Sequence, residues 1–184
     1  DEKGQLQHYV GPFSDITNQY QQQQRLEKIA LYDAMTGLPN RSALTTQLQS
    51  LLQRANTNNV LAVAYLDLDG FKEINDRHGH ETGDQFLIAL SERLKSQLAN
   101  EELLARIGGD EFVVLLPGLT DKTAGLAKIQ QLLDAVAKPL KIDEWMLSVS
   151  ASVGLTFYPQ TDTTEAEQLI RTFVAAGFQK IHLD

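Results

Sequence analysis

The chain has 184 residues, a length that fits one ordinary domain with additional residues at an end. Of these residues 42% are hydrophobic and 22% charged, which is typical of a folded protein. Its formal net charge of −8 argues against unaided binding to DNA or RNA, whereas a divalent cation can still hold a single nucleotide on such a surface. The sequence has no cysteine, which excludes disulfides and thiolate metal sites. It also has no apolar run of membrane-spanning length and no signal-peptide pattern. We therefore expect a cytoplasmic domain, whether or not the full-length protein is associated with a membrane.

The first elements change from a strand to helices. Residues 6–16 alternate between polar and apolar side chains, which predicts a strand. Residues 18–30 are rich in Gln and carry a narrow apolar stripe, which favours an exposed helix or a two-stranded coil. A Gly and a Pro within residues 33–41 interrupt this pattern, and Leu residues then recur at helical spacing over residues 41–54.

A buried strand with acidic residues at its end follows. Residues 60–68 form a nearly continuous apolar run, which is typical of a strand covered on both faces, and Asp67 and Asp69 lie at its carboxyl end. Residues 71–75 are compatible with a short helical turn, and residues 81–98 form an amphipathic helical pattern.

The second half begins with a predicted hairpin. Two short apolar runs, residues 103–107 and 112–116, flank a Gly-Gly-Asp-Glu sequence, in which glycine supplies the positive φ angles of a tight turn. The remaining predicted elements are a helix over 126–137, strands over 140–142 and 146–157, and a helix over 163–176. Because helices return between the strands, we expect an α/β (α+β) fold with one or two helical layers on a sheet.

Three acidic residues are predicted to converge at one edge of this sheet. Asp67 ends the buried strand, and Asp110 and Glu111 occupy the hairpin tip, so pairing of the hairpin beside the strand would bring their carboxylates together. Such carboxylates repel one another unless a cation lies between them, and Mg²⁺ accepts carboxylate oxygens while leaving positions for substrate phosphates. Two such ions would also polarise a phosphorus centre and activate an attacking hydroxyl.

A purely structural alternative exists for each of these features. Asp67 and Asp69 would cap the following helical turn, and Gly108 and Gly109 would only close a hairpin. Other polar residues in the same region fit a nucleotide site: the backbone around Phe71 and Lys72 is suited to phosphate, and Asn75 and Asp84 to the edge of guanine. Lys72 is also explained as an ordinary surface lysine, Asn75 as a turn residue and Asp84 as an acid at a helix N-terminus. It is the combination that favours a site.

Four ordered motifs resemble the GGDEF family of diguanylate cyclases. They are residues 33–41 (DAMTGLPNR), 67–76 (DLDGFKEIND), 79–84 (GHETGD) and 106–112 (RIGGDEF), and residues 150–154 (SASVG) resemble a further family strand. The resemblance covers residues 33 to about 159. It implies a palm-like, ferredoxin-type sheet flanked by helices, similar to nucleotide cyclases, that joins two GTP molecules into cyclic di-GMP.

The resemblance also implies roles for individual residues. Asp67, the Leu68 carbonyl and Glu111, with Asp110, would bind two Mg²⁺ (or Mn²⁺) ions per active site, and Asp110 would lie close to the reacting hydroxyl. The substrate-binding set would be Asn75 and Asp84 at guanine, with Phe71, Lys72, Gly108 and Gly109 near the phosphates. Each protomer would hold one GTP, so catalysis would require a homodimer with facing sites.

The N-terminal part has a second likeness. Residues 1–17 resemble the last strand and exit of a PAS sensor domain, and residues 18–32 would then form a signalling helix that pairs the protomers. Residues 33–184 would form the GGDEF catalytic domain, with an atypical C-terminal segment. An upstream PAS sensor, GTP and a second copy of the chain are the partners that this arrangement implies, and no nucleic acid is expected.

Two departures from the family pattern bear on activity. The family's product-inhibition motif, Arg-x-x-Asp, is replaced at its first and last positions by Ala99 and Glu102, so we expect no product-inhibition site. The family's C-terminal Lys and Arg, which hold the GTP phosphates, are also absent: the lysine position is Ile181 in an ungapped alignment and Val174 in a gapped one, with Phe178 at the arginine. Losing two charge-assisted contacts of about 1.5–3 kcal/mol each would weaken GTP binding unless Lys72 or Lys180 replaces them.

These observations leave two principal hypotheses. The intact metal and guanine positions favour an active diguanylate cyclase, whereas the altered C-terminal segment favours a degenerate GTP-binding module that regulates another enzyme. A purely structural dimerisation module would leave the clustered acids without an explanation.

Overall fold

The computed structural model describes residues 29–54 and 59–158. The strand expected over 6–16, the helix expected over 18–30 up to residue 28, and the helix expected over 163–176 lie outside these residues. Residues 29–31 are helical, and Tyr32 and Pro39 then form an isolated antiparallel bridge that closes a wide turn before α2 (Arg41–Arg54). Asn40 caps α2, because its Oδ1 accepts hydrogen bonds from the backbone N–H groups of Ser42 and Ala43 at 2.9 and 3.1 Å.

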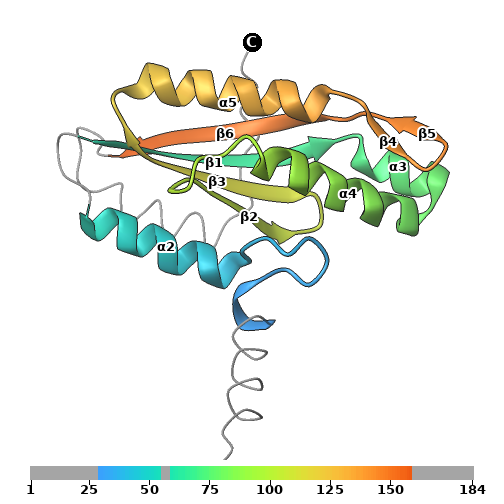
Figure 1. The fold of residues 1–184 in the computed structure, drawn as a ribbon, viewed down its shortest axis with the longest axis horizontal. Coiled ribbons are helices and arrows are strands. Elements are labelled where there is room, and N and C mark those ends of the chain that lie inside the picture. The colour runs from blue at the N-terminus through green and yellow to red at the C-terminus, as the bar shows by residue number, and fades with distance from the viewer. Residues whose placement is uncertain (1–28, 55–58, 159–184) are drawn as a thin grey trace, which may run out of the picture.

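A four-stranded antiparallel sheet with the order β2-β3-β1-β6 forms the centre of the domain (Figure 1). Its strands are β1 (Val60–Asp69), β2 (Leu103–Gly108), β3 (Glu111–Leu119) and β6 (Ser150–Tyr158). A separate two-stranded hairpin consists of β4 (Leu140–Ile142) and β5 (Trp145–Leu147). The strand expected over 146–157 is therefore divided between β5 and β6, and Ser148 and Val149 lie between them.

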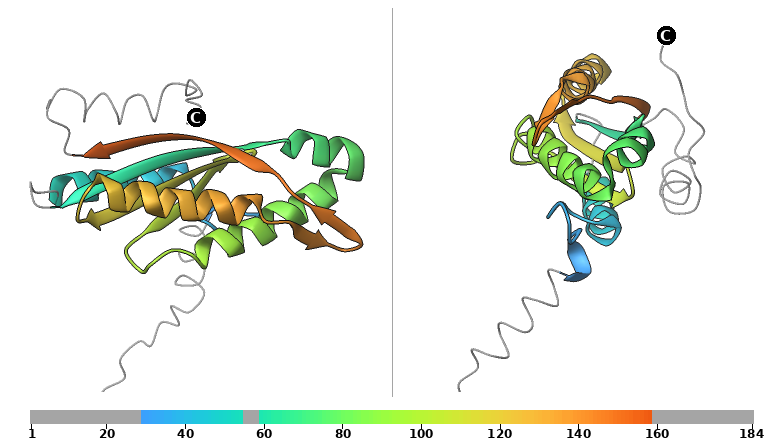
Figure 2. Two further views of the ribbon diagram at one scale, coloured as in Figure 1. Left: turned by 90° about the horizontal axis from the view of Figure 1, so that it is seen from above. Right: turned by 90° about the vertical axis from the view of Figure 1, so that its right-hand side faces the viewer.

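Helices cover both faces of the sheet. α3 (Phe71–His78), α4 (His80–Lys95) and α5 (Lys122–Ala137) lie on one face, and α2 lies on the other (Figures 1 and 2). The strand residues divide accordingly: Ala62, Ala64 and Leu66 of β1 pack with the three helices, whereas the alternate residues pack with α2. This two-sided burial explains why residues 60–66 of β1 form a continuous apolar run rather than an alternating pattern.

The expected α+β fold is confirmed, but the bounds of three helices differ from those that the apolar pattern indicated. The turn expected over 71–75 is the full helix α3, and α4 ends at Lys95 rather than at residue 98. α5 begins at Lys122 instead of 126, because the Asp121 side chain accepts a hydrogen bond from the Ala124 backbone N–H and caps the helix. Polar caps of this kind lie outside the apolar periodicity on which the prediction relied.

Arg93 joins α4 to the end of α5. Its guanidinium donates hydrogen bonds to the carbonyl oxygens of Ala135 (3.1 Å), Lys138 and Pro139 (2.9 Å). The last carbonyls of a helix have no partner within the helix and carry partial negative charge, so a cation there is favourable. Arg93 thereby also holds the start of the β4–β5 hairpin.

We predict that Arg93→Met lowers the free energy of unfolding by about 2–3 kcal/mol, because three carbonyl oxygens lose a charged donor. Urea unfolding followed by circular dichroism would measure this change. Lys95→Met, which removes an exposed cation from the same helix, is the matched control and should change stability by less than about 0.5 kcal/mol. Equal effects of the two substitutions would contradict the prediction.

Candidate active site

The pairing of β1 with β3 places two acidic residues side by side. In this antiparallel register Asp67 lies directly opposite Glu111, and Tyr65 lies opposite Val113. Side chains of directly opposed residues project from the same face of a sheet, with Cβ atoms roughly 4.5–5.5 Å apart. Both carboxylate side chains are partly buried. The expectation that the hairpin brings Asp67 and Glu111 together is therefore met by the strand register.

The Gly-Gly turn makes this register possible. Gly108 and Gly109 have φ angles of 153° and 51°, which lie in the region that favours glycine. The following residue, Asp110, accepts a hydrogen bond at its carbonyl oxygen from the Leu68 backbone N–H, at 3.3 Å. The turn is thus attached to the end of β1, next to Asp67.

Not all of the acidic residues converge. Asp69 lies at the end of β1, and its carboxylate accepts hydrogen bonds from the Ser152 hydroxyl of β6 at 2.9 and 3.1 Å. Asp110 belongs to the turn before β3, and it does not complete a three-carboxylate group with Asp67 and Glu111. Within residues 29–54 and 59–158, no three His, Asp or Glu side chains gather closely enough to hold a metal by themselves.

The remaining donor set still fits Mg²⁺. This ion is commonly held by one or two carboxylates together with water and substrate phosphates, rather than by a complete protein cage. Asp67, Glu111 and the intervening backbone at Leu68 supply oxygen donors of that kind at one sheet edge.

A tyrosine hydroxyl donates a hydrogen bond to Glu111, one member of this pair. Tyr65 is 8% exposed. Its pKa is raised well above the ordinary value of 10.0, first by burial, then by the hydrogen bond to Glu111 and by the negative charges of Glu111 and Asp67. Arg41, at the start of α2, has the opposite effect on this pKa. Tyr65 therefore stays protonated at neutral pH and acts as a hydrogen-bond donor. Sequence reasoning missed Tyr65, although its position two residues before Asp67 on a strand indicated the same face.

The residues expected at guanine and phosphate lie on the first turns beyond β1. Asn75 of α3 packs against Gly83 of α4, since a Cβ on Gly83 would lie 1.9 Å from the Asn75 Oδ1 atom. Asp84 is the next residue and is exposed, so Asn75 and Asp84 border the same α3–α4 junction. Lys72 is exposed on α3, whereas the Phe71 ring is buried against Phe86. Only the backbone of Phe71 can therefore contribute to a phosphate site.

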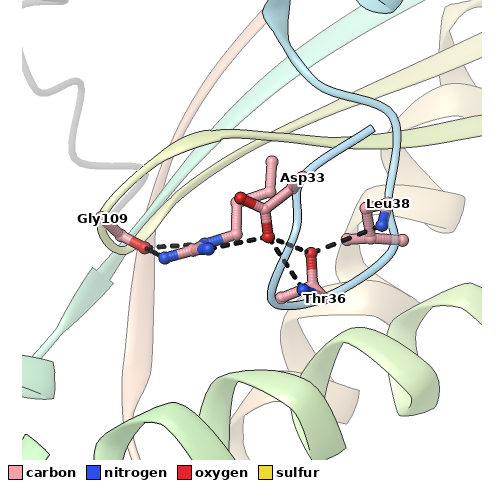
Figure 3. Close-up of polar contacts among 5 residues, drawn as sticks. Asp33, Thr36, Leu38 and Gly109 are labelled. Atoms are coloured by element: carbon pink, nitrogen blue, oxygen red, sulfur yellow. Dashed lines mark hydrogen bonds and ion pairs between the residues drawn. The ribbon is translucent and has the colours of Figure 1, made fainter. Parts of the chain in front are cut away.

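A buried ion pair links the turn before α2 to the Gly-Gly turn. Arg106 of β2, 8% exposed, forms a 2.8 Å ion pair with Asp33 and donates two hydrogen bonds, of 2.9 and 2.7 Å, to the Gly109 carbonyl oxygen. The Asp33 carboxylate also accepts hydrogen bonds from the backbone and hydroxyl of Thr36 (Figure 3). The two motifs at residues 33–41 and 106–112 are thus one connected structure.

Comparison with known proteins identifies the family. The sequence profile described as "Diguanylate cyclase, GGDEF domain" matches residues 30–176. The chain belongs to the GGDEF family. The PAS domain expected before it is not shown in this chain, and residues 1–17 lie outside the described structure.

Characterised relatives of this GGDEF domain carry different activities in their names. It is 38% identical over 142 residues to the diguanylate cyclase TpbB of Pseudomonas aeruginosa, covering 76% of this chain and 33% of that protein. It is 36% identical over 151 residues to the bifunctional cyclase/phosphodiesterase MucR of the same species, covering 82% and 22%. It is also 40% identical over 147 residues to the Escherichia coli cyclic di-GMP phosphodiesterase PdeR, covering 80% and 22%. The chain thus spans a fifth to a third of these relatives.

Solved structures confirm the fold of the GGDEF domain. The isolated GGDEF domain of TpbB aligns with a TM-score of 0.67 at 34% identity, covering 76% of this chain and 88% of that one. A sensory box/GGDEF family protein from Caulobacter crescentus aligns with a TM-score of 0.68 at 36% identity, covering 77% and 92%. Within residues 29–54 and 59–158, no helix of the GGDEF domain has the length and apolar character to cross a bilayer.

The Asp33–Arg106 pair makes stability depend on pH. Burial alone would raise the pKa of Asp33, but hydrogen bonds from Thr36 and then the contacts with Arg106 outweigh it and lower the pKa below its ordinary 3.8. A carboxyl with a lowered folded-state pKa contributes its stability above the unfolded-state pKa of about 3.9, and this contribution is lost as the pH falls through the folded-state pKa.

We therefore predict that Asp33→Asn lowers the free energy of unfolding at pH 7 by about 2 kcal/mol or more, because buried Arg106 loses its charged partner. The difference from wild type should shrink as the pH is lowered below about 4. Urea unfolding at pH 7 and pH 3 would measure it, with Asp76→Asn, an exposed acid on α3, as the control. A difference that does not depend on pH would contradict the role of the ionised carboxylate.

Proposed function

We propose that this GGDEF domain is a diguanylate cyclase that condenses two GTP molecules into cyclic di-GMP. The observation that carries the proposal is the cross-strand pair of Asp67 and Glu111, held beside the Gly-Gly turn at the carboxyl end of β1. Two carboxylates this close repel each other unless a cation or hydrogen-bond donors lie beside them. They are suited to a substrate that arrives with divalent cations.

In this proposal Asp67, Glu111 and the Leu68 carbonyl hold Mg²⁺ or Mn²⁺, two ions per active site, with Asp110 adjacent. The ions neutralise phosphate charge and lower the pKa of a hydroxyl. Asn75 and Asp84 border the guanine position, because an amide and a carboxylate can pair with its N1–H and amino groups. Lys72, the backbone of Phe71, and Gly108 and Gly109 would lie near the phosphates.

The reaction requires two copies of the domain. Each would hold one GTP, and the 3′-hydroxyl oxygen of one GTP would attack the α-phosphorus of the other. A new P–O bond forms, the bond to pyrophosphate breaks, and the hydroxyl proton is lost; the same exchange in the other direction closes the ring. Facing active sites supply the orientation on which the rate of such a transfer depends. We propose a cytoplasmic homodimer joined through the N-terminal helix, with an upstream PAS sensor as the source of regulation.

A second candidate is a GTP-binding regulatory domain without catalysis. The C-terminal segment favours it, because the positions of the family's phosphate-binding Lys and Arg hold no basic residue in the gapped alignment. Relatives at 36–40% identity include proteins named for cyclase and for phosphodiesterase activity, so identity by itself does not decide between the two functions.

Incubating the full-length dimeric protein with GTP and Mg²⁺ separates these functions. We predict formation of cyclic di-GMP and pyrophosphate, and a fall in the rate of about 100-fold or more in Glu111→Gln, while the variant stays folded. Glu92→Gln, an exposed acid on α4, should keep the wild-type rate. GTP binding without product from wild type would instead support the regulatory domain.

At the position of the family's product-inhibition motif, Glu102 contacts other residues of this chain. Glu102 accepts a hydrogen bond from the Ala99 backbone N–H at 2.8 Å and forms a 3.0 Å ion pair with Lys128. Lys128 also donates to the Gln97 carbonyl oxygen at 2.7 Å. The loop thus closes on itself around a carboxylate that is already paired with Lys128, and residues 99–102 offer no arginine to a dianionic product.

We predict that cyclic di-GMP does not bind at this loop. Equilibrium dialysis with labelled cyclic di-GMP should give the same result for wild type and for Glu102→Ala, since no site depends on this carboxylate. Tight binding by wild type that Glu102→Ala abolishes would overturn the prediction.

A further inference from the structure

Tyr65 lies on the face of the sheet that α2 covers, next to the acidic pair of Asp67 and Glu111. Tyr65 is two residues before Asp67 on β1, so both side chains project from the same face. Because Tyr65 opposes Val113 and Asp67 opposes Glu111, Tyr65 and Glu111 are diagonal neighbours across the two strands. A side chain as long as tyrosine can span that diagonal, and its hydroxyl donates a hydrogen bond to the Glu111 carboxylate.

The Tyr65 side chain is packed in the core beneath α2. Its ring belongs to a cluster of apolar side chains that includes Leu44 and Leu48 of α2 and Val113 of β3. A phenylalanine would fill the same space without burying a polar group, and a buried hydroxyl costs stability unless it is hydrogen-bonded. The hydrogen bond to the Glu111 carboxylate offsets this cost.

Glu111 needs such a partner because of its neighbour. It faces Asp67 directly, and two like charges at this separation favour conformations in which the carboxylates turn apart. A glutamate also has several rotatable bonds, so fixing its carboxylate costs conformational entropy. A donor held rigidly in the core restricts these rotations. Arg41 places a positive charge in the electrostatic surroundings of Tyr65 and thus partly offsets the two acids.

We propose that Tyr65 is a positioning residue that holds the Glu111 carboxylate beside Asp67, in the geometry that binds a divalent cation. The inference rests on the metal role of Glu111 in the proposed function, and it assigns the orientation of that ligand to the core beneath α2. The Glu111 carboxylate is thereby held in its metal-binding orientation before nucleotide and metal bind.

Mn²⁺ binding to the full-length protein tests the proposal without depending on turnover. Titration with Mn²⁺, with free Mn²⁺ followed by electron paramagnetic resonance, should show affinity about 3- to 10-fold weaker in Tyr65→Phe. This is less than the full value of a hydrogen bond to a charged group, because Tyr65 contacts the ligand Glu111 and not the ion. Tyr158→Phe is the matched control: it removes a hydroxyl from a residue that packs on the same cluster and pairs with Leu61 at the other end of β1. It should bind Mn²⁺ as wild type does.

A double-mutant cycle separates positioning from general destabilisation. If Tyr65 acts through Glu111, Tyr65→Phe should cause no further loss of Mn²⁺ affinity in a Glu111→Gln background. Wild-type affinity in folded Tyr65→Phe, alongside weak binding by Glu111→Gln, would overturn the positioning role and leave the proposed function intact. Equal Mn²⁺ binding by wild type and Glu111→Gln would instead overturn the metal role of Glu111, and the inference with it.

Discussion

The candidate site depends on the antiparallel register between β1 and β3. A shift by one residue would move Glu111 to the opposite face of the sheet from Asp67, because successive side chains of a strand alternate between faces. Burial on both faces of the sheet keeps this register in place: the alternate residues of β1 pack with α2 on one side and with α3, α4 and α5 on the other. The position of the acidic pair is therefore a consequence of core packing.

The Gly-Gly turn is stabilised from two directions. The Leu68 N–H holds the Asp110 carbonyl from the side of β1, and the Arg106 guanidinium holds the Gly109 carbonyl from the side of β2. Arg106 in turn is paired with Asp33, in the turn that connects residues 29–31 to α2. The turn before α2 and the turn that carries Asp110 are thus linked through the side chains of Asp33 and Arg106.

Much of the fold and of the candidate site could be predicted because local signals agree with the tertiary structure. The apolar run of β1 indicated a strand buried on both faces, and the two glycines indicated a tight turn with positive φ. Motif spacing indicated that Asp67 and Glu111 belong to one site. The limits of α3, α4 and α5 were less accurate, since caps such as Asp121 depend on single hydrogen bonds rather than on a repeating pattern.

The sequence by itself determined the family, the elements and the residues able to do chemistry, because composition, periodicity and turn-forming glycines act over short stretches of chain. Only the tertiary structure decided which of those residues meet. It turned Asp69 to Ser152, buried the Phe71 ring in the core, and left Asp110 outside a three-acid cluster. It also joined Tyr65 to Glu111 and Arg106 to Asp33. Such contacts depend on strand order and register, which are set by the packing of the whole core rather than by neighbouring residues.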